Sequence, residues 1–411
     1  MSVKSVNVIG LGYIGLPTAT LIANNGFQVY GMDPVQRVVD TINQGRIHIV
    51  EPGLEGFVKK AVNSGRLIAD VHPHEADVFI LAVPTPFKGE KRPDLSYVEA
   101  AAREIAPCLH EGNLVILEST SPVGTTEKVR EWIIDERPEL SGKELYFAHC
   151  PERVLPGKIV QELSANDRII GGVDEASTKK TVEFYSHFVK GALLETDDKT
   201  AELSKLTENS FRDVNIAFAN ELSIICEKLG INVWELIRLA NRHPRVNILQ
   251  PGPGVGGHCI AVDPWFIVDS APAEARLIRT ARQVNDNKPH YVMAKVFDSI
   301  KEVVGDNGTP KIACLGLAFK PDIDDLRESP ALQIAAELAA DSKAQILAVE
   351  PNVHELPQVL SGMKNVVFMD YMEAIRQADI VLLLVDHKEF KAMDTAVLQG
   401  KIVIDTRGIW A

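Results

Sequence analysis

The sequence lacks any segment long and apolar enough to cross a membrane. Its longest purely aliphatic run, Ile380 to Val385, falls far short of the roughly 20 residues that a spanning helix needs. A strand-like run begins almost at once with Val6, so we expect no signal peptide. A basic surplus is also missing, since the formal charge is −13 at pH 7. Nucleic acids and anionic membranes bind basic faces, so the sequence predicts neither as a partner.

Cysteine is scarce, and the five cysteines are scattered without a CxxC pair. An odd, unpaired set is typical of reduced thiols rather than of a disulfide framework, so we expect a cytoplasmic enzyme. His72 and His74 form an isolated His-x-His without further candidate ligands, and no metal site is predicted. The chain has no fixed-period repeat and no low-complexity tract, while its length favours two or three domains.

A βαβ pattern opens the chain. Residues 5–10 read as an apolar strand, residues 16–25 as a helix and residues 27–32 as a second strand. The turn between the first strand and the helix reads Gly10-Leu-Gly12-Tyr-Ile-Gly15. In this context the glycines permit a tight turn and close backbone approach, and the helix N-terminus receives a pyrophosphate. A Gly turn with a purely structural role is the alternative.

Asp33 ends the second strand of this unit. At that place a carboxylate accepts hydrogen bonds from the ribose hydroxyls of a dinucleotide and repels a 2′-phosphate. The sequence therefore predicts NAD, rather than NADP, as the cofactor.

The rest of the chain predicts two Rossmann-like, doubly wound α/β domains joined by a central domain with a long helix. Residues 199–229 contain neither Gly nor Pro and read as one helix. A Gly- and Pro-containing linker at 305–310 precedes a second α/β pattern, whose first turn lacks GxGxxG and is expected to bind something other than a second dinucleotide. We expect domains at 1–195, 196–304 and 305–411.

One stripe of the long helix is polar. Lys205, Asn209 and Arg212 share a face at i, i+4 and i+7, opposite an apolar stripe that includes Leu203 and Phe218. On spacing alone this is a solvated stripe. Asn is mildly unfavourable inside a helix, however, and Lys with Asn could stabilise a developing oxyanion.

Cys259 follows a glycine-rich run, Gly254-Val-Gly-Gly-His258. A thiolate captures an aldehyde as a thiohemiacetal that still carries a transferable hydride, so a cysteine beside a nicotinamide site allows an alcohol to be oxidised to an acid. A small buried hydrophobe is the alternative for Cys259. His258 could stabilise the thiolate or bond within the loop, and Asp263 supplies a carboxylate four residues on.

Loops after other strands carry further candidates. Glu152 could position a water or act as a general base, or form an exposed ion pair with Arg153. Lys320, Arg327 and Arg245 are loop cations suited to an anionic substrate.

Seven short blocks of this sequence, among them the motifs above, occur in the same order in a known family. The blocks are Gly10 to Leu16, Val83-Pro-Thr-Pro86, Ser119-Thr-Ser-Pro-Val-Gly124, Pro151-Glu-Arg153, Lys205-Leu-Thr-Glu-Asn209, Gly256-Gly-His-Cys259, and Gly316 to Asp322 with Arg327-Glu-Ser329. Over essentially its whole length the chain resembles the nucleotide-sugar 6-dehydrogenases, the family of the UDP-glucose and GDP-mannose dehydrogenases. The nucleophile block GGSCFPKD of the glucose enzymes has His258 in place of Ser and Ala261-Val262 in place of Pro-Lys here. This departure looks like the branch that acts on N-acetylhexosamines.

The resemblance implies a UDP-sugar substrate, NAD in the first domain, UDP in the last domain and a homodimer or higher homo-oligomer. It implies Cys259 as the nucleophile, Lys205 and Asn209 at the oxyanion, and Lys205, or a water held by Glu152 or Asp263, as the base. It assigns NAD binding to Gly10, Gly12, Tyr13, Ile14, Gly15, Asp33, Thr85, Thr120, Thr126 and Arg327. It assigns substrate binding to Arg153, Val154, Lys205, Asn209, Arg212, His243, Arg245, Gly256, Lys320 and Arg407, some of them from a dimer partner.

Two other functions remain open from the sequence. A one-step β-hydroxyacid dehydrogenase shares a Rossmann domain and a helical domain but needs neither Cys259 nor a third α/β domain. A non-catalytic NAD sensor would keep the glycines but has no need of Lys205, Asn209 and Cys259 together.

Overall fold

The structure, a computed structural model, describes residues 3–89, 91–155, 157–257, 259–303 and 309–410. The chain divides into two compact units, one of residues 1–208 and 265–272 and the other of residues 209–264 and 273–411, which are described separately. Within the described ranges no helix is both long and apolar enough to span a bilayer.

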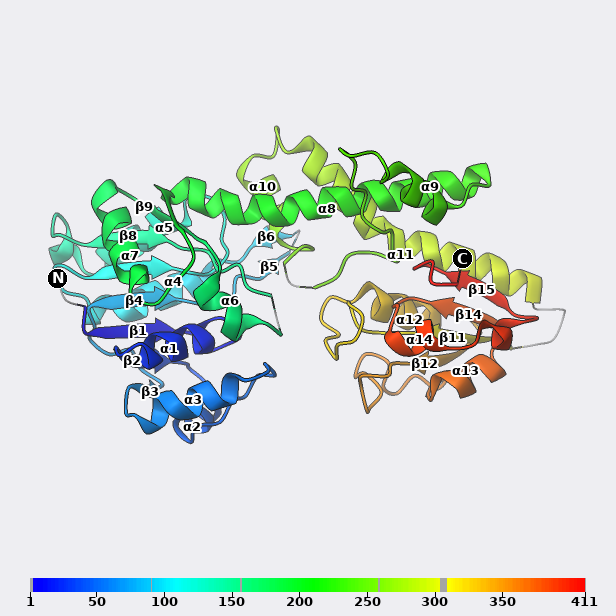
Figure 1. Ribbon diagram of the computed structural model, residues 1–411, viewed down its shortest axis with the longest axis horizontal. Coiled ribbons are helices and arrows are strands. Elements are labelled where there is room, and N and C mark those ends of the chain that lie inside the picture. Colours follow the sequence, from blue (N-terminus) through cyan, green and yellow to red (C-terminus); the bar gives the residue numbers. More distant parts are fainter. Residues whose placement is uncertain (1–2, 90, 156, 258, 304–308, 411) are drawn as a thin grey trace. The chain divides into compact units, whose positions relative to one another are not determined.

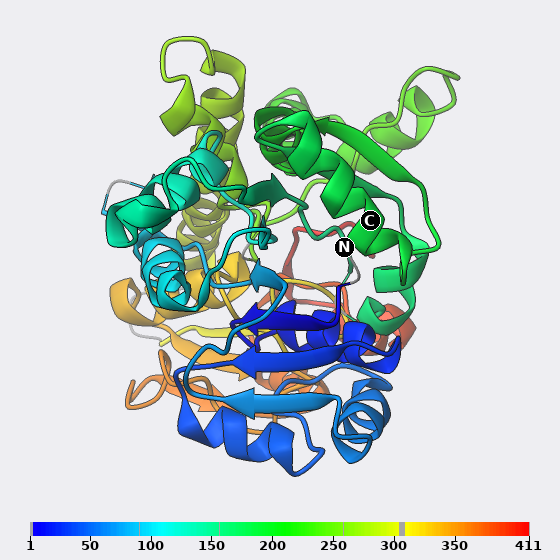
Figure 2. The same cartoon turned by 90° about the vertical axis from the view of Figure 1, so that its left-hand side faces the viewer.

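The first unit contains a sheet whose strands pair in parallel except at one antiparallel pair. In its described residues eight strands pair in the order β10-β9-β8-β7-β4-β1-β2-β3, and only the β8–β9 pair is antiparallel (Figures 1 and 2). The strands are β1 Ser5–Ile9, β2 Gln28–Met32, β3 Leu67–Asp70, β4 Val78–Leu81, β7 Leu114–Leu117, β8 Tyr146–His149, β9 Arg168–Gly172 and β10 Leu193–Asp197. A two-stranded hairpin, β5 Phe87–Lys88 and β6 Arg92–Pro93, lies apart from this sheet.

The central strands of this sheet are apolar on both faces because helices cover both. Val78 and Ile80 of β4 belong to one hydrophobic cluster, while Phe79 and Leu81 belong to another. Successive side chains of a strand point to opposite faces, so this alternation marks a doubly wound sheet. The covering helices are α1 Gly15–Asn24, α3 Leu54–Asn63 and α7 Glu175–Ser186 on one face, and α4 Ser96–Ile105 and α5 Thr125–Glu136 on the other. Two short helices, α2 Gln36–Asn43 and α6 Ile159–Ala165, complete the unit.

Four helices follow the first sheet in sequence: α8 Asp198–Leu229, α9 Val233–Ala240, α10 Asp263–Ser270 and α11 Arg276–Val303. The long helix predicted over residues 199–229 is confirmed as the 32-residue α8. The boundary between the two units falls inside α8, between Glu208 and Asn209.

A second doubly wound sheet lies in the other unit. Its described strands are all parallel, in the order β13-β12-β11-β14-β15. They are β11 Lys311–Leu315, β12 Gln345–Val349, β13 Val366–Phe368, β14 Ile380–Leu383 and β15 Ile402–Asp405. Helices α11 and α12 (Pro330–Asp341) cover one face, and α13 (Tyr371–Gln377) and α14 (Lys388–Ala392) cover the other. The predicted fold class, two Rossmann-like sheets with a long helix between them in sequence, is confirmed.

Candidate active site

The three glycines of the first turn differ in what a side chain would meet at each position. Gly10 has a φ of +88°, and a Cβ there would lie 2.6 Å from the Ala82 carbonyl oxygen. A Cβ on Gly15 would lie 1.8 Å from the Gly10 carbonyl oxygen. A Cβ on Gly12 would meet no atom within 4 Å, so this glycine leaves open space above the N-terminus of α1. That is the space a pyrophosphate needs to approach the backbone, and these residues therefore fit the dinucleotide that the sequence predicts.

The carboxylate of Asp33 lies beside this turn, at the end of β2. Its Oδ2 accepts a hydrogen bond from the Leu11 N–H at 3.2 Å. In the same unit the Thr85 hydroxyl donates to the Thr120 carbonyl oxygen at 2.6 Å, so the loops after β4 and β7 meet. The side chain of Tyr13 is 37 % exposed in the turn. The structure thus brings most of the predicted cofactor residues to one edge of the sheet.

Thr126 has a partner that the sequence did not indicate. Its hydroxyl and its N–H both donate to Glu202 Oε1, at 2.7 and 2.8 Å. Glu202 Oε2 accepts from the Gly124 N–H, so this carboxylate from α8 occupies the N-terminus of α5. Burial raises the pKa of Glu202 to about 7, against the hydrogen bonds that lower it. Thr126 therefore helps to join α5 to α8.

Three donor groups contact the carboxylate of Glu152. Its Oε1 accepts from the N–H groups of Arg153 and Val154 at 2.6 and 3.0 Å, and its Oε2 lies 2.8 Å from the Arg168 guanidinium. Glu152 and Arg168 are 8 % and 3 % exposed. The exposed Glu152–Arg153 ion pair considered as an alternative is therefore wrong. Arg168 also approaches Glu118, whose pKa burial raises to about 7.

Arg153 pairs instead with a residue of the long helix. Its Nη2 lies 2.7 Å from Glu208 Oε1, inside the Lys205-to-Asn209 block. The loop after Val154 is fixed separately by Glu51, which accepts from the N–H groups of Gly157 and Ile159 at 2.8 and 2.9 Å. The sequence reasoning missed Glu51, Glu202 and Glu208, because an acidic side chain on a helix or loop gives no sign of a distant partner.

The polar stripe of α8 is not uniformly solvated. Asn209 is 6 % exposed, and its amide nitrogen donates to Asp263 Oδ2 at 2.6 Å. Lys205 is half-buried, whereas Arg212 is exposed. The solvated-stripe interpretation is therefore wrong for Asn209.

Cys259 is exposed, so the alternative of a buried hydrophobe is wrong. The Asp263 N–H donates to the Cys259 carbonyl oxygen at 2.9 Å, which ties the nucleophile candidate to the start of α10. His258 lies outside the described residues. The structure thus brings Cys259, Asp263 and Asn209 together within one unit.

A buried polar network supports both ends of the glycine-rich loop. At one end Arg282 Nη1 donates to the Ile260 carbonyl oxygen at 3.3 Å and to Asp213 Oδ1 at 2.5 Å. Burial raises the pKa of Asp213 to about 6, while Arg282 opposes the rise. Asn285 Nδ2 also donates to Asp213 Oδ1, at 2.8 Å. This end of the network joins α8 and α11 to the residue that follows Cys259.

The same network reaches the other end of the loop. Asn220 Nδ2 donates to Asn285 Oδ1 at 2.8 Å, and Asn220 Oδ1 accepts from the Gly252 N–H at 2.9 Å. Side chains of α8 and α11 thus hold the loop at Gly252 and at Ile260.

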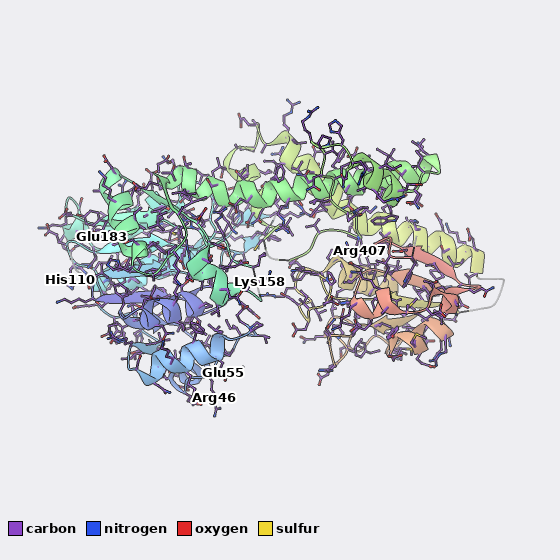
Figure 3. All side chains as sticks on the ribbon, viewed as in Figure 1. Arg46, Glu55, His110, Lys158, Glu183 and Arg407 are labelled. Carbon is purple, nitrogen blue, oxygen red and sulfur yellow. The ribbon has the colours of Figure 1, made fainter. Side chains whose placement is uncertain are left out.

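Between these two points the loop packs against the first turn of the second sheet. A Cβ on Gly256 would lie 2.4 Å from the Glu328 carbonyl oxygen, and a Cβ on Gly252 would lie 2.5 Å from Arg407 Nη1. Arg407, labelled in Figure 3, follows β15, and its Nε donates to Asp386 Oδ1 at 2.9 Å. Lys320 is exposed in the turn after β11. Two predicted substrate residues, Gly256 and Arg407, therefore lie at this loop.

Three further predicted residues are exposed. Arg327 is exposed, and its Nη2 lies 2.6 Å from Asp325 Oδ2. His243 and Arg245 are exposed after α9, where the Arg245 N–H donates to His243 Nδ1 at 3.3 Å.

A carboxylate also lies beside the first turn of the second sheet. Glu350, directly after β12, accepts from the N–H groups of Leu317 and Ala318 at 2.8 and 2.9 Å. The contact with Leu317 is the counterpart of the contact between Asp33 and the Leu11 N–H in the first sheet.

His387 completes this arrangement. Its Nε2 lies 3.0 Å from Glu350 Oε2, and its Nδ1 accepts from the Asp322 N–H at 2.9 Å. Asp322, His387 and Glu389 lie close enough together to hold a metal ion. Because both ring nitrogens of His387 already have protein partners, the ring offers no lone pair to such an ion.

Comparison with known proteins decides the family. Residues 4–189 match the NAD binding domain of the UDP-glucose/GDP-mannose dehydrogenase family, residues 199–287 match its central domain and residues 313–411 match its UDP binding domain. The chain belongs to this family. It is an NAD-dependent dehydrogenase of nucleotide sugars, which confirms the resemblance, the cofactor and the class of substrate expected from the sequence.

Relatives in the family are similar over nearly their whole length. The chain is 58% identical to UDP-N-acetyl-D-mannosamine dehydrogenase of Campylobacter jejuni, with 94% of this chain and 96% of that protein covered. It is 57% identical to NDP-N-acetyl-D-galactosaminuronic acid dehydrogenase of Ralstonia nicotianae, with 99% and 96% covered. The solved UDP-N-acetyl-mannosamine dehydrogenase of Staphylococcus aureus has 42% identity and a TM-score of 0.86, with 99% and 95% covered.

Proposed function

We propose that this protein oxidises the C6 hydroxyl of UDP-N-acetyl-D-mannosamine to the carboxylate, giving UDP-N-acetyl-D-mannosaminuronate with two NAD reduced per sugar. The observation that carries the proposal is the contact of Asn209 with Asp263, next to an exposed Cys259. Oxidation of an alcohol to an acid requires a nucleophile that captures the aldehyde, and the exposed thiol provides it. Relatives with this substrate in their names support the choice of sugar.

The residues of this chain divide the work as follows. NAD, when bound at the first turn, accepts a hydride in each of the two oxidations. Cys259 attacks the aldehyde carbon and forms a thiohemiacetal, whose oxidation leaves a thioester. The Lys205 ammonium and the Asn209 amide stabilise the negative charge that develops on the C6 oxygen. Water then attacks the thioester, the carbon–sulfur bond breaks, and the carboxylate leaves while Cys259 regains its thiol.

The sequence leaves three candidates for the general base. The contacts favour Lys205 or Asp263 over Glu152. Both oxygens of Glu152 face donors of its own loop or Arg168. These contacts tie the Glu152 carboxylate to its own loop and to Arg168. We propose that Glu152 shapes the loop that carries Arg153 and Val154, and that Asp263 positions the hydrolytic water.

The sugar epimer is the point that most needs a direct test. The relatives named for mannosamine and for galactosaminuronic acid are 58% and 57% identical to this chain, so identity alone does not separate them. The test offers UDP-N-acetylmannosamine and its gluco and galacto epimers separately and compares kcat/KM. The proposal predicts the highest value for the manno sugar. A higher value for another epimer would keep the mechanism and change the substrate.

We propose the domain division 1–195, 196–304 and 305–411, which the three family matches support. We also propose a homodimer in the cytoplasm that feeds polysaccharide synthesis. Leu203, Phe218 and Ile225 on α8 are 42 %, 54 % and 43 % exposed, and such an apolar stripe is typical of a subunit interface. Sedimentation of the wild type and of Phe218→Glu tests this: a wild-type monomer would contradict the dimer.

A further inference from the structure

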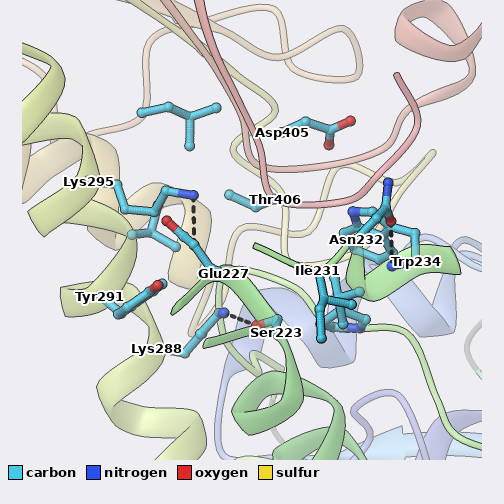
Figure 4. Close-up of a pocket in the computed structure, with 14 residues that line it drawn as sticks. Ser223, Glu227, Ile231, Asn232, Trp234, Lys288, Tyr291, Lys295, Asp405 and Thr406 are labelled. Atoms are coloured by element: carbon cyan, nitrogen blue, oxygen red, sulfur yellow. Dashed lines mark hydrogen bonds and ion pairs between the residues drawn. The ribbon is translucent and has the colours of Figure 1, made fainter. Parts of the chain in front are cut away.

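A cavity of about 330 Å³ lies within the second unit. It opens between the C-terminal part of α8, helix α11, the start of α9 and the residues at the end of β15 (Figure 4). Its volume lies in the range of small-molecule sites, roughly 300–1,000 Å³. None of its lining residues belongs to the proposed catalytic, cofactor or substrate sets.

Lys288 lines this cavity and is 6 % exposed. Its ammonium donates to the Ser223 hydroxyl and lies 5.0 Å from the centre of the Tyr291 ring. Among the described residues no carboxylate forms an ion pair with Lys288. Burial of an ammonium without a counter-charge costs several kcal/mol. Burial, and secondly the charge of Lys295, lowers the pKa of Lys288 to about 8.

Other charged side chains at the cavity have hydrogen-bond or ion-pair partners of their own. Lys295 Nζ lies 3.0 Å from Glu227 Oε2 (Figure 4). The Asp405 carboxylate accepts from the N–H groups of Arg407, Gly408 and Trp410 at 2.8, 2.6 and 2.9 Å. Lys288 therefore lacks, among the described residues, a carboxylate that would neutralise its charge.

We propose that this cavity is a binding site for a small organic or inorganic anion, with the Lys288 ammonium as its counter-charge. The Lys288 ammonium has three N–H donors, and an ammonium forms charge-assisted hydrogen bonds with the oxygens of a phosphate or a carboxylate. Both groups share this oxyanion chemistry, and inorganic phosphate and D-glucuronate are the probes that distinguish them.

The cavity lies next to the anchor of the glycine-rich loop. The Ser223 hydroxyl donates to the Asn220 carbonyl oxygen at 2.6 Å, and the Asn220 side chain accepts from the Gly252 N–H. An anion bound in the cavity would thus lie near the start of the loop that leads to Cys259.

The test titrates the full-length protein with phosphate and, separately, with glucuronate by calorimetry, and follows the melting temperature. An anion that binds only the folded state raises the melting temperature. Lys288→Met keeps the length of the side chain and removes its charge. Lys301→Met is the matched control, because Lys301 lies on the same helix in an exposed pair with Asp298 at 2.7 Å.

We expect at least one anion to bind the wild type and Lys301→Met alike, and to bind Lys288→Met at least about tenfold more weakly. Equal binding by Lys288→Met would place the anion elsewhere and overturn the proposal. If Lys288→Met does not fold, Lys288→Gln takes its place with the same expectation. A wild type that shows no saturable binding of either anion also overturns the proposal. Since no turnover is measured, failure here is independent of failure of the proposed dehydrogenase activity.

Discussion

The amide of Asn209 donates to the carboxylate of Asp263 at 2.6 Å, across 54 positions of sequence. Both side chains are buried, at 6 % and 4 % exposure. The contact joins the motif on α8 to the motif that contains Cys259. Asn209 therefore has two tasks in the proposed mechanism: it orients Asp263, and it stabilises charge on the C6 oxygen.

Asn209→Ala should lower kcat for uronate formation by about 10²–10³-fold, because it removes an oxyanion donor and leaves Asp263 without its amide partner. The expected change in KM is smaller. Asn215→Ala is the control, since Asn215 is on the same helix and its amide donates to the backbone of that helix, at Phe211. Steady-state kinetics decide, and an unchanged kcat for Asn209→Ala would remove Asn209 from the site.

Asp33→Ala should raise the KM for NAD by about tenfold, the equivalent of one lost hydrogen-bonded contact of about 1.4 kcal/mol. The ribose hydroxyls lose their acceptor, and the Leu11 N–H loses its side-chain partner. Asp40→Ala serves as the control, because Asp40 is exposed on α2 and bonds to Gln36. If the KM for NAD of the Asp33 variant equals that of the wild type, Asp33 does not bind the ribose.

Arg282→Ala should lower the free energy of unfolding by about 3–5 kcal/mol, because it leaves the Asp213 carboxylate buried without its cation. Arg282 and Asp213 are both fully buried. Lys301→Ala breaks an exposed ion pair with Asp298 and should cost about 1 kcal/mol or less. Urea unfolding measures both variants. Equal midpoints for the two would show that the Arg282 network contributes little.

Glu350 should make the protein sensitive to acid. Burial alone would raise the pKa of Glu350, but His387 and the N–H groups of Leu317 and Ala318 lower it to about 2. A folded-state pKa below the ordinary value of 4.5 means that the ionised carboxylate stabilises the fold above that pH. The stability is lost as the pH falls from about 4.5 towards about 2.

Urea unfolding of wild type and Glu350→Gln at several pH values tests this assignment. The variant should be less stable at neutral pH and should lose less stability in acid. If both proteins lose the same free energy of unfolding as the pH falls, other groups cause the acid sensitivity.

The sheets and the long helix were predictable because their signals are local. Apolar strands such as residues 114–117 and the Gly10-to-Gly15 turn can be recognised from neighbouring residues alone. Strands β9 and β10 were not predicted. Their sequences, RIIGG and LLETD, mix apolar residues with glycine or charge, and β10, at the edge of the sheet, is only partly buried.

The supporting contacts of the site were not predictable for a different reason. Glu202 reaches Thr126 over 76 positions, and Arg282 reaches Asp213 over 69. On a helix such residues look like an ordinary solvated face, and only tertiary structure shows that they are buried. Cys259 and Asp33 could be predicted because the motifs around them indicate a chemical role. The residues that position them could not be predicted.

The most direct test of the account is the amount of NADH formed per mole of limiting UDP-N-acetylmannosamine, with Cys259→Ala measured beside the wild type. The account predicts two NADH per sugar and a uronate product for the wild type, because the thiol holds the aldehyde for a second oxidation. It predicts no uronate for Cys259→Ala. One NADH per sugar from the wild type, or full four-electron turnover by Cys259→Ala, would contradict it.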